Sequence, residues 1–173
     1  MDQALTAILR GDPNALILLL QGQDREWGAV LRKRFEHTIG PEAARIRFLP
    51  RQPHDGYMRL LSLSDVSLDS FPFCGGNTTY QALAMGTPVV TLPGDYLRGR
   101  LSLAIYRHMG MMDCVARDSS DFANIALRLG TDPAFRSKIV NQIRDRSDRI
   151  FNDPIFLADA VRFLLTCEPL ERK

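Results

Sequence analysis

The stretch Cys74–Gln81, "CGGNTTYQ", combines residue types that can hold an anion. Paired glycines let the backbone approach a ligand closely and adopt turns that other residues avoid. Asn77, Thr78 and Thr79 add polar side chains, and at the start of a helix the free N–H groups and the helix dipole favour negative charge. The same residues also fit an ordinary helix cap, in which Asn77 or Thr78 accepts a backbone N–H. Local chemistry leaves both interpretations open.

The stretch differs from two common phosphate-binding motifs. No Gly-Lys-Ser/Thr follows it, as a P-loop would require, and its glycines lack the GxGxxG spacing of dinucleotide folds. Its position relative to the neighbouring strands and helices therefore has to decide its role.

Short apolar runs alternate with helical patterns along the chain. The pattern predicts strands at 15–20, 46–49, 66–68, 88–92 and 113–116, and helices at 26–38, 54–62, 78–85, 99–109, 119–130, 133–151 and 154–167. The run at 15–20 is typical of a strand buried on both faces. The alternation predicts an α/β fold, a Rossmann-like parallel sheet with helices on both faces. Ligands bind such sheets at the carboxyl ends of the strands, and the glycine stretch follows the third strand.

Composition limits the class of protein. The chain has 173 residues and a net charge of +2, which fits one domain over 1–173 and argues against nucleic-acid binding. The longest apolar run, at 15–20, is too short to cross a membrane, and we expect no signal peptide. Cys74, Cys114 and Cys167 lack CxxC spacing and indicate reduced packing thiols in a cytoplasmic protein. No cluster of metal ligands is visible, so we expect no metal and no cofactor.

Three segments carry a family resemblance. "DVSLDSFPFCGGNTTYQALAMGTPVVTLPGDYLRGRLS", "ALRLGTDPAF" and "SDRIFNDPIFLADAVRFL" resemble glycosyltransferase family 41, which includes bacterial O-linked N-acetylglucosamine transferases and SPINDLY-like enzymes. The resemblance covers essentially the whole chain. It implies the C-terminal, UDP-binding lobe of a GT-B glycosyltransferase, with 150–173 as its closing helix and the N-terminal acceptor lobe absent.

The resemblance also implies site residues. The diphosphate of a UDP-sugar is expected at Gly76, Asn77, Thr78 and Thr79, and the ribose at Gln81. Gln81 stands where the family has an acid, so its hydrogen bonds lack the charge that strengthens them.

The nucleobase is expected at the turn "FLPRQPHDGY", where the family implies Gln52, His54 and Tyr57. His54 also fits a simple first-turn helix residue, and Tyr57 fits a core residue. Their roles remain open at the level of sequence.

Four polar residues near the strand ends remain ambiguous. Asp69 is expected to fix the loop by accepting backbone N–H bonds. Arg98 and Arg100 fit either neutralisation of a diphosphate or solvated surface positions. His108, in an apolar helical stretch, fits a packing histidine better than a catalyst.

The resemblance implies an inverting, metal-independent transfer of N-acetylglucosamine or a hexose from a nucleotide sugar to a protein or peptide. The acceptor site and catalytic base would lie in the absent N-terminal lobe, so we expect this chain alone to be inactive. Two alternatives remain open. One is the donor-binding lobe of another GT-B enzyme, such as a nucleotide-sugar epimerase, and the other is a non-catalytic α/β binding module.

Overall fold

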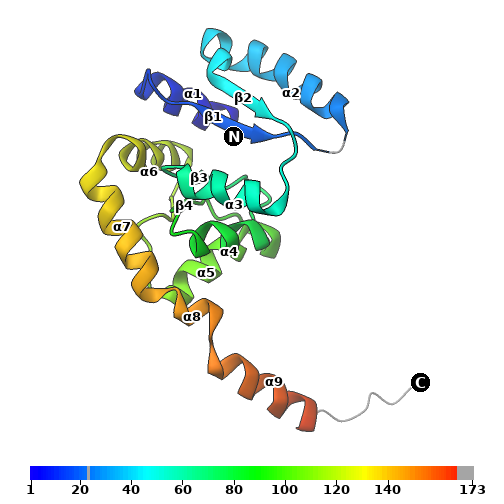
Figure 1. The fold of residues 1–173 in the computed structure, drawn as a ribbon, viewed down its shortest axis with the longest axis vertical. Coiled ribbons are helices and arrows are strands. Elements are labelled where there is room, and N and C mark those ends of the chain that lie inside the picture. Colours follow the sequence, from blue (N-terminus) through cyan, green and yellow to red (C-terminus); the bar gives the residue numbers. More distant parts are fainter. Residues whose placement is uncertain (23, 167–173) are drawn as a thin grey trace.

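The computed structural model describes residues 1–22 and 24–166 of the chain. Short strands and helices alternate as the apolar pattern predicts (Figure 1). In chain order the elements are α1 (Asp2–Gly11), β1 (Ile17–Leu20), α2 (Arg25–Thr38), the 3-10 helix η1 (Gly40–Arg45), β2 (Ile46–Leu49), α3 (His54–Leu63), β3 (Ser67–Leu68), α4 (Asn77–Ala84), β4 (Val89–Val90), the 3-10 helix η2 (Leu97–Gly99), α5 (Leu101–Met109), α6 (Ser119–Thr131), α7 (Pro133–Arg146), α8 (Asp148–Phe151) and α9 (Pro154–Thr166).

All strand pairs are parallel, which confirms the predicted fold class, but the strands form two separate pairs. β1 pairs with β2, and β3 pairs with β4. The strand expected at 113–116 is reduced to one parallel bridge between Thr91 and Val115. Leu68 of β3 packs against both core clusters of the molecule. Side-chain contacts, rather than ladder hydrogen bonds, therefore join the two pairs.

Helices cover both faces of β4 but only one face of β1. Val89 and Val90 point to opposite faces of β4 and are 2% and 0% exposed. In β1, Ile17 is buried in the cluster that also contains α1 and α2 residues, whereas Leu18 and Leu20 remain 42% and 39% exposed. The expectation that this run is buried on both faces is therefore wrong, because α1 and α2 pack only on the side of Ile17.

The main core surrounds Tyr106 of α5, which is fully buried. Its hydroxyl donates to the carbonyl of Val89 at 2.8 Å and accepts the Val89 N–H at 2.9 Å, so it connects α5 to β4. Cys74 and Cys114 are buried free thiols, as predicted. Cys167 lies outside the described residues.

The C-terminus of α5 is closed by two arginines from later in the chain. Gly110 ends the helix in the left-handed region, at φ +69°. Arg146 donates to the Gly110 carbonyl, and Arg149 donates to the Met109 carbonyl at 3.2 Å. These bonds hold the end of α7 and the start of α8 against α5 and satisfy carbonyls that the helix leaves free.

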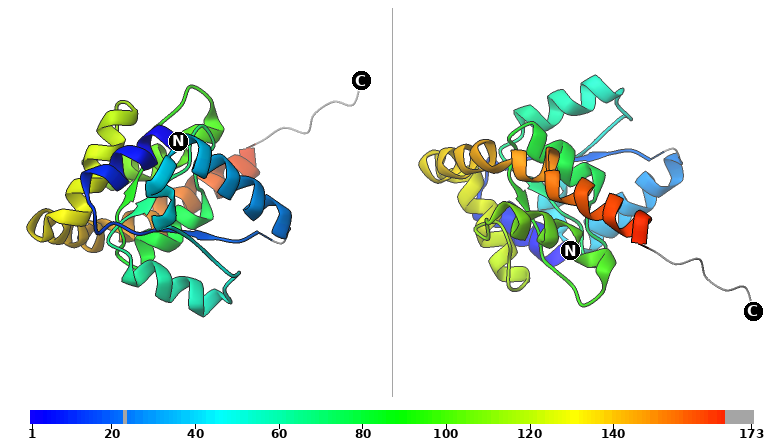
Figure 2. Two further views of the ribbon diagram at one scale, coloured as in Figure 1. Left: turned by 90° about the horizontal axis from the view of Figure 1, so that it is seen from above. Right: turned by 90° about the horizontal axis from the view of Figure 1, so that it is seen from below.

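The expected closing helix at 150–173 is divided. The chain leaves α8 at Phe151 and begins α9 at Pro154, and the part beyond Thr166 lies outside the described residues. Figures 1 and 2 show α9 projecting from the body, and none of its residues is buried. Asp153 accepts the N–H of Ile155 at 2.9 Å and lies 3.2 Å from His108, so it connects α9 to α5.

Candidate nucleotide-binding site

Three helices begin at the carboxyl ends of the parallel strands without a side-chain cap. α3, α4 and α5 follow β2, β3 and β4, and α3 packs against α4 (Figure 1). Their N-cap residues are Pro53, Gly76 and Arg100, and none accepts a capping bond through its side chain. Each helix therefore leaves N–H groups free at the strand ends, where α/β folds bind ligands.

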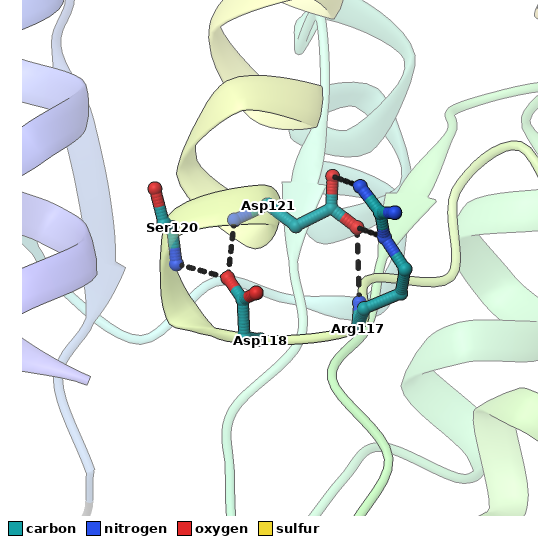
Figure 3. A network of polar contacts seen from close by, with 4 residues as sticks. All are labelled: Arg117, Asp118, Ser120 and Asp121. Carbon is teal, nitrogen blue, oxygen red and sulfur yellow. Dashed lines mark hydrogen bonds and ion pairs between the residues drawn. The ribbon is translucent and has the colours of Figure 1, made fainter.

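Three other helices are capped by aspartates, whereas α1 and α8 also begin without a side-chain cap. Asp24, Asp118 and Asp132 accept backbone N–H bonds at the starts of α2, α6 and α7. Figure 3 shows the start of α6, where Asp118 accepts the N–H groups of Ser120 and Asp121 at 2.9 and 2.8 Å. The first N–H groups of α2, α6 and α7 thus have a side-chain partner, which those of α3, α4 and α5 lack.

The glycine turn leads directly into the uncapped helix α4. Gly76 is the N-cap and Asn77 the first helical residue, so the interpretation of Asn77 or Thr78 as an ordinary cap is wrong. Within the described part of the chain, the N–H groups of Gly76, Asn77 and Thr78 donate no hydrogen bond. Asn77 and Thr78 are exposed. The turn therefore has three consecutive N–H groups without a protein partner, next to the exposed residues Asn77 and Thr78.

Buried side chains on the inner side of the turn fix its conformation. Asp69, 6% exposed at the end of β3, accepts the Gly75 N–H at 2.6 Å and the Thr91 hydroxyl at 2.8 Å. The expectation that Asp69 fixes the loop through a backbone N–H is confirmed. Ser102 donates to the Gly75 carbonyl at 3.3 Å.

Thr79 lies on the inner side of the turn, unlike Thr78. Its side chain is 2% exposed, and its hydroxyl lies 2.9 Å from that of Ser102. Because the Ser102 hydrogen is directed at Gly75, Thr79 is the donor in this pair. The hydroxyl of Thr79 is thus engaged within the protein, and the prediction that it contacts a diphosphate is not tested by this arrangement.

Gln81 lies one helical turn after Asn77 and is half-buried. Among the described residues its side chain has no hydrogen-bond partner, so both its amide donor and its carbonyl acceptor remain free for a ligand. Beside it, Tyr80 is directed to Phe151 of α8, with ring centroids 5.9 Å apart in an edge-to-face arrangement.

The residues predicted for the nucleobase lie around the start of α3. The Gln52 side chain donates to the Pro50 carbonyl at 2.8 Å, and His54 is exposed at the first position of the helix. Tyr57 is half-buried and packs against the main core, and burial raises the pKa of its hydroxyl. Tyr57 therefore has the packing role that its alternative interpretation describes, and the nucleobase assignments stay predictions.

The side chains of the two arginines and of His108 make contacts outside the glycine turn, although the Arg98 carbonyl accepts the N–H of Cys74 at 2.9 Å. Arg100 donates to the Gly94 carbonyl at 2.9 Å, and the guanidinium of Arg98 lies 4.8 Å from the centre of the Tyr96 ring. His108 is half-exposed and paired with Asp153 rather than packed in the core. Its expected packing role is therefore wrong, because it lies on the side of α5 that meets the start of α9.

Two cavities lie away from the predicted site. One of about 500 Å³ is enclosed by the ends of β1 and β2 and the start of α2, with Trp27 and Phe48 in its wall. The other, of about 380 Å³, lies between the ends of α3 and α4 and the side of α7, with Arg136 and Arg144 in its wall. The predicted site residues line neither of these two cavities.

Two residues of this site were missed from the sequence. Thr91 and Ser102 interrupt the apolar runs "VVTL" and "LSLAIY", and both prove to be buried. A hydroxyl within an apolar strand or helix is a usable signal, because buried hydroxyls require partners.

Neither a cluster of metal ligands nor a membrane-spanning helix occurs in the described part of the chain. Residues 1–22 and 24–166 contain no group of three His, Cys, Asp or Glu side chains that could hold a metal ion. In the same residues, no helix has the length and apolar character needed to cross a membrane. The expectation of metal-free chemistry stays a prediction.

Parallel strand pairs covered by helices define an α/β lobe, and three of its helices begin at the strand ends without a side-chain cap. The profile of "Glycosyl transferase family 41" matches residues 2–159, and the chain belongs to this family.

Relatives and a solved structure agree with this assignment. The chain is 32% identical over 133 residues to a probable UDP-N-acetylglucosamine–peptide N-acetylglucosaminyltransferase SPINDLY from Arabidopsis thaliana, covering 73% of this chain and 14% of that protein. It is also 32% identical over 126 residues to a UDP-N-acetylglucosamine–peptide N-acetylglucosaminyltransferase from Caenorhabditis elegans, covering 72% and 11%. A mutant Thermobaculum terrenum O-GlcNAc transferase superposes with a TM-score of 0.82 at 30% identity, over 93% of this chain and 32% of that one.

The chain therefore spans only a small part of these enzymes, 11–14% of the two curated relatives and about a third of the solved chain. It has the fold of part of a GT-B glycosyltransferase, as predicted. Among the predicted function classes, the family favours a glycosyltransferase over an epimerase.

Proposed function

We propose that residues 1–173 form the donor-binding lobe of a family 41 glycosyltransferase that uses a UDP-sugar. The observation that carries the proposal is the row of free N–H groups at Gly76, Asn77 and Thr78, next to a glycine whose N–H and carbonyl are held by Asp69 and Ser102. Family membership supports the choice of a nucleotide sugar over other anions.

The diphosphate would lie against these N–H groups and the hydroxyl of Thr78. Free N–H groups and the dipole of α4 stabilise the charge that develops on the diphosphate as its bond to the sugar breaks. In this proposal the leaving group is stabilised by backbone groups and needs no metal, and the sugar is transferred with inversion. Gln81 would bind the ribose, and the turn from Gln52 to Tyr57 would hold the base.

The names of the relatives support a protein or peptide acceptor. We propose that acceptor binding and the catalytic base are provided by a further lobe, and that residues 1–173 alone bind donor without transferring sugar. A radiolabelled UDP-N-acetylglucosamine assay with an acceptor peptide would test this, since turnover by this polypeptide alone would contradict it.

Calorimetric titration with UDP, UDP-N-acetylglucosamine, GDP and uridine tests the donor site. We expect UDP to bind and Thr78→Val to weaken it about tenfold, the usual effect of losing a hydrogen bond to a charged group. Thr131→Val, at the exposed end of α6, is the matched control and should leave affinity unchanged.

The titration also separates the alternatives. A chain that binds none of these nucleotides would contradict the donor-site proposal and favour a non-catalytic module. If the chain preferred GDP to UDP, the donor site would stand but its donor would be a GDP-sugar.

A further inference from the structure

The buried polar side chains of this protein are concentrated under one turn. Five polar or charged residues are buried among the described residues: Asp69, Thr79, Thr87, Thr91 and Ser102. All except Thr87 belong to one hydrogen-bonded network that surrounds Gly75, and we call these four residues the Gly75 clamp.

The clamp holds both peptide groups of Gly75. Asp69 accepts the N–H of Gly75, and Ser102 donates to its carbonyl. Thr91, the residue after β4, donates to the second carboxylate oxygen of Asp69, and the hydroxyls of Thr79 in α4 and Ser102 in α5 are hydrogen-bonded to each other. The turn is thus tied to a core strand on one side and to the helices α4 and α5 on the other.

Gly75 has no room for a side chain within the clamp. A β-carbon there would lie 2.5 Å from the hydroxyl of Thr78 and 2.8 Å from that of Thr79. A β-carbon would therefore require both hydroxyls to shift, and the buried hydroxyl of Thr79 is held in place by Ser102.

The network contains a buried carboxylate, that of Asp69. Burying a carboxylate is costly even when it is hydrogen-bonded, and no ion pair with Asp69 is formed among the described residues. Polar groups buried at such cost tend to fix a conformation that function needs, which an apolar contact would leave free to vary.

We propose that the Gly75 clamp is a positioning device for the donor diphosphate, with Asp69 as its central positioning residue. By occupying the N–H of Gly75, it directs the following N–H groups of Gly76, Asn77 and Thr78 to the ligand. Thr79 then acts through Ser102 and the backbone rather than by touching the diphosphate. This inference rests on the proposed donor site and adds the residues that keep it in shape.

Comparing the affinities of a variant for UDP and for uridine distinguishes a misplaced turn from a destabilised fold. A variant that only destabilises the fold weakens both ligands equally, whereas a variant that misplaces the turn weakens UDP alone. We expect Asp69→Asn to weaken UDP about tenfold or more, because the amide cannot accept from both Gly75 and Thr91, with uridine affinity changed less than about twofold. Thr91→Val should act in the same direction, more weakly.

Thr87→Val provides the matched control. Thr87 is the fifth buried polar residue, and its hydroxyl donates to the Leu61 carbonyl at 2.7 Å, outside the clamp. This variant should lower stability and leave the ratio of UDP to uridine affinity unchanged. The proposal would be overturned if Asp69→Asn weakened UDP and uridine binding equally. It would also be overturned if Thr87→Val changed the ratio of UDP to uridine affinity as much as Asp69→Asn does.

Amide NMR spectra of the full chain test the clamp without a ligand. In Asp69→Asn we expect the amide resonances of Gly75 to Thr78 to move and their hydrogen exchange to accelerate, while those of α6 stay in place. Unchanged resonances at the turn would also overturn the clamp. If wild type binds no nucleotide while these amides respond as expected, the donor-site proposal fails and the clamp remains as a conformational device.

Discussion

At the scale of single residues, the proposed ribose contact of Gln81 would limit how strongly the ribose is held. An amide makes neutral hydrogen bonds to ribose hydroxyls, whereas a carboxylate makes charge-assisted bonds of roughly twice the strength. We predict that Gln81→Glu raises UDP affinity several-fold, about the gain from one charge-assisted bond, and that Gln81→Ala lowers it.

Titration with a UDP analogue lacking both ribose hydroxyls checks this prediction. The gain in Gln81→Glu should vanish with the analogue, because its hydroxyl partners are missing. An equal gain for both ligands would place residue 81 away from the ribose.

Tyr106 and Cys114 make the core sensitive to high pH. Burial raises the pKa of the Cys114 thiol from its ordinary 9.0 to about 12, and burial also raises the pKa of Tyr106 well above its usual 10.0. Below about pH 9 both groups stay protonated in the folded and unfolded chain, so stability does not depend on them. Above pH 9 the unfolded chain loses these protons first, and stability falls as pH rises toward 12.

Urea unfolding at pH 7, 9, 10 and 11 measures this loss. Tyr106→Phe should be less stable at pH 7 by about 1–3 kcal/mol, because the Val89 peptide loses its partner, and should decline less between pH 9 and 11. A wild-type protein with unchanged stability at pH 11 would contradict the prediction.

At the scale of elements, the junction of α5 with α8 depends on Gly110. A residue with a side chain is strained at φ +69°, and a β-carbon would lie 3.1 Å from a guanidinium nitrogen of Arg149. We predict that Gly110→Ala lowers the free energy of unfolding by about 1–2 kcal/mol. Gly130→Ala in α6 is the matched control, since a β-carbon there meets nothing within 4 Å, and it should be neutral or slightly stabilising.

At the scale of the whole molecule, α9 contributes little to the folded body. None of its residues is buried, and large apolar side chains such as Phe156, Phe163 and Leu165 are 72%, 67% and 81% exposed. We predict that a chain ending at Asp153, which retains the contact with His108, has the same melting temperature within about 2 °C and aggregates less. Scanning calorimetry and light scattering measure both quantities, and a large drop in melting temperature would show that α9 stabilises the body.

Much of the fold could be predicted from the sequence because its signals are local. Apolar runs and proline or glycine boundaries located β2 at 46–49 and the start of α9 at Pro154. Coverage of β1 could not be predicted, since a continuous apolar run reads the same whether one face or both are buried.

The site likewise contains residues that the sequence could predict and residues that it could not. The glycines, Asn77 and Thr78 could be found from their types and order, because free N–H groups at a helix start follow from local sequence. The burial of Thr79 and its link to Ser102, 23 residues further along the chain, depends on how α4 packs against α5. Contacts of this kind are set by packing and carry little signal in a single sequence.

The three uncapped helix starts at the strand ends have a practical consequence for any laboratory that handles this chain. Orthophosphate, sulfate and citrate are drawn to free N–H groups as a nucleotide is. Such ions in a purification buffer would compete with UDP at the proposed donor site and weaken its apparent affinity, whereas an amine buffer with chloride leaves the helix starts accessible.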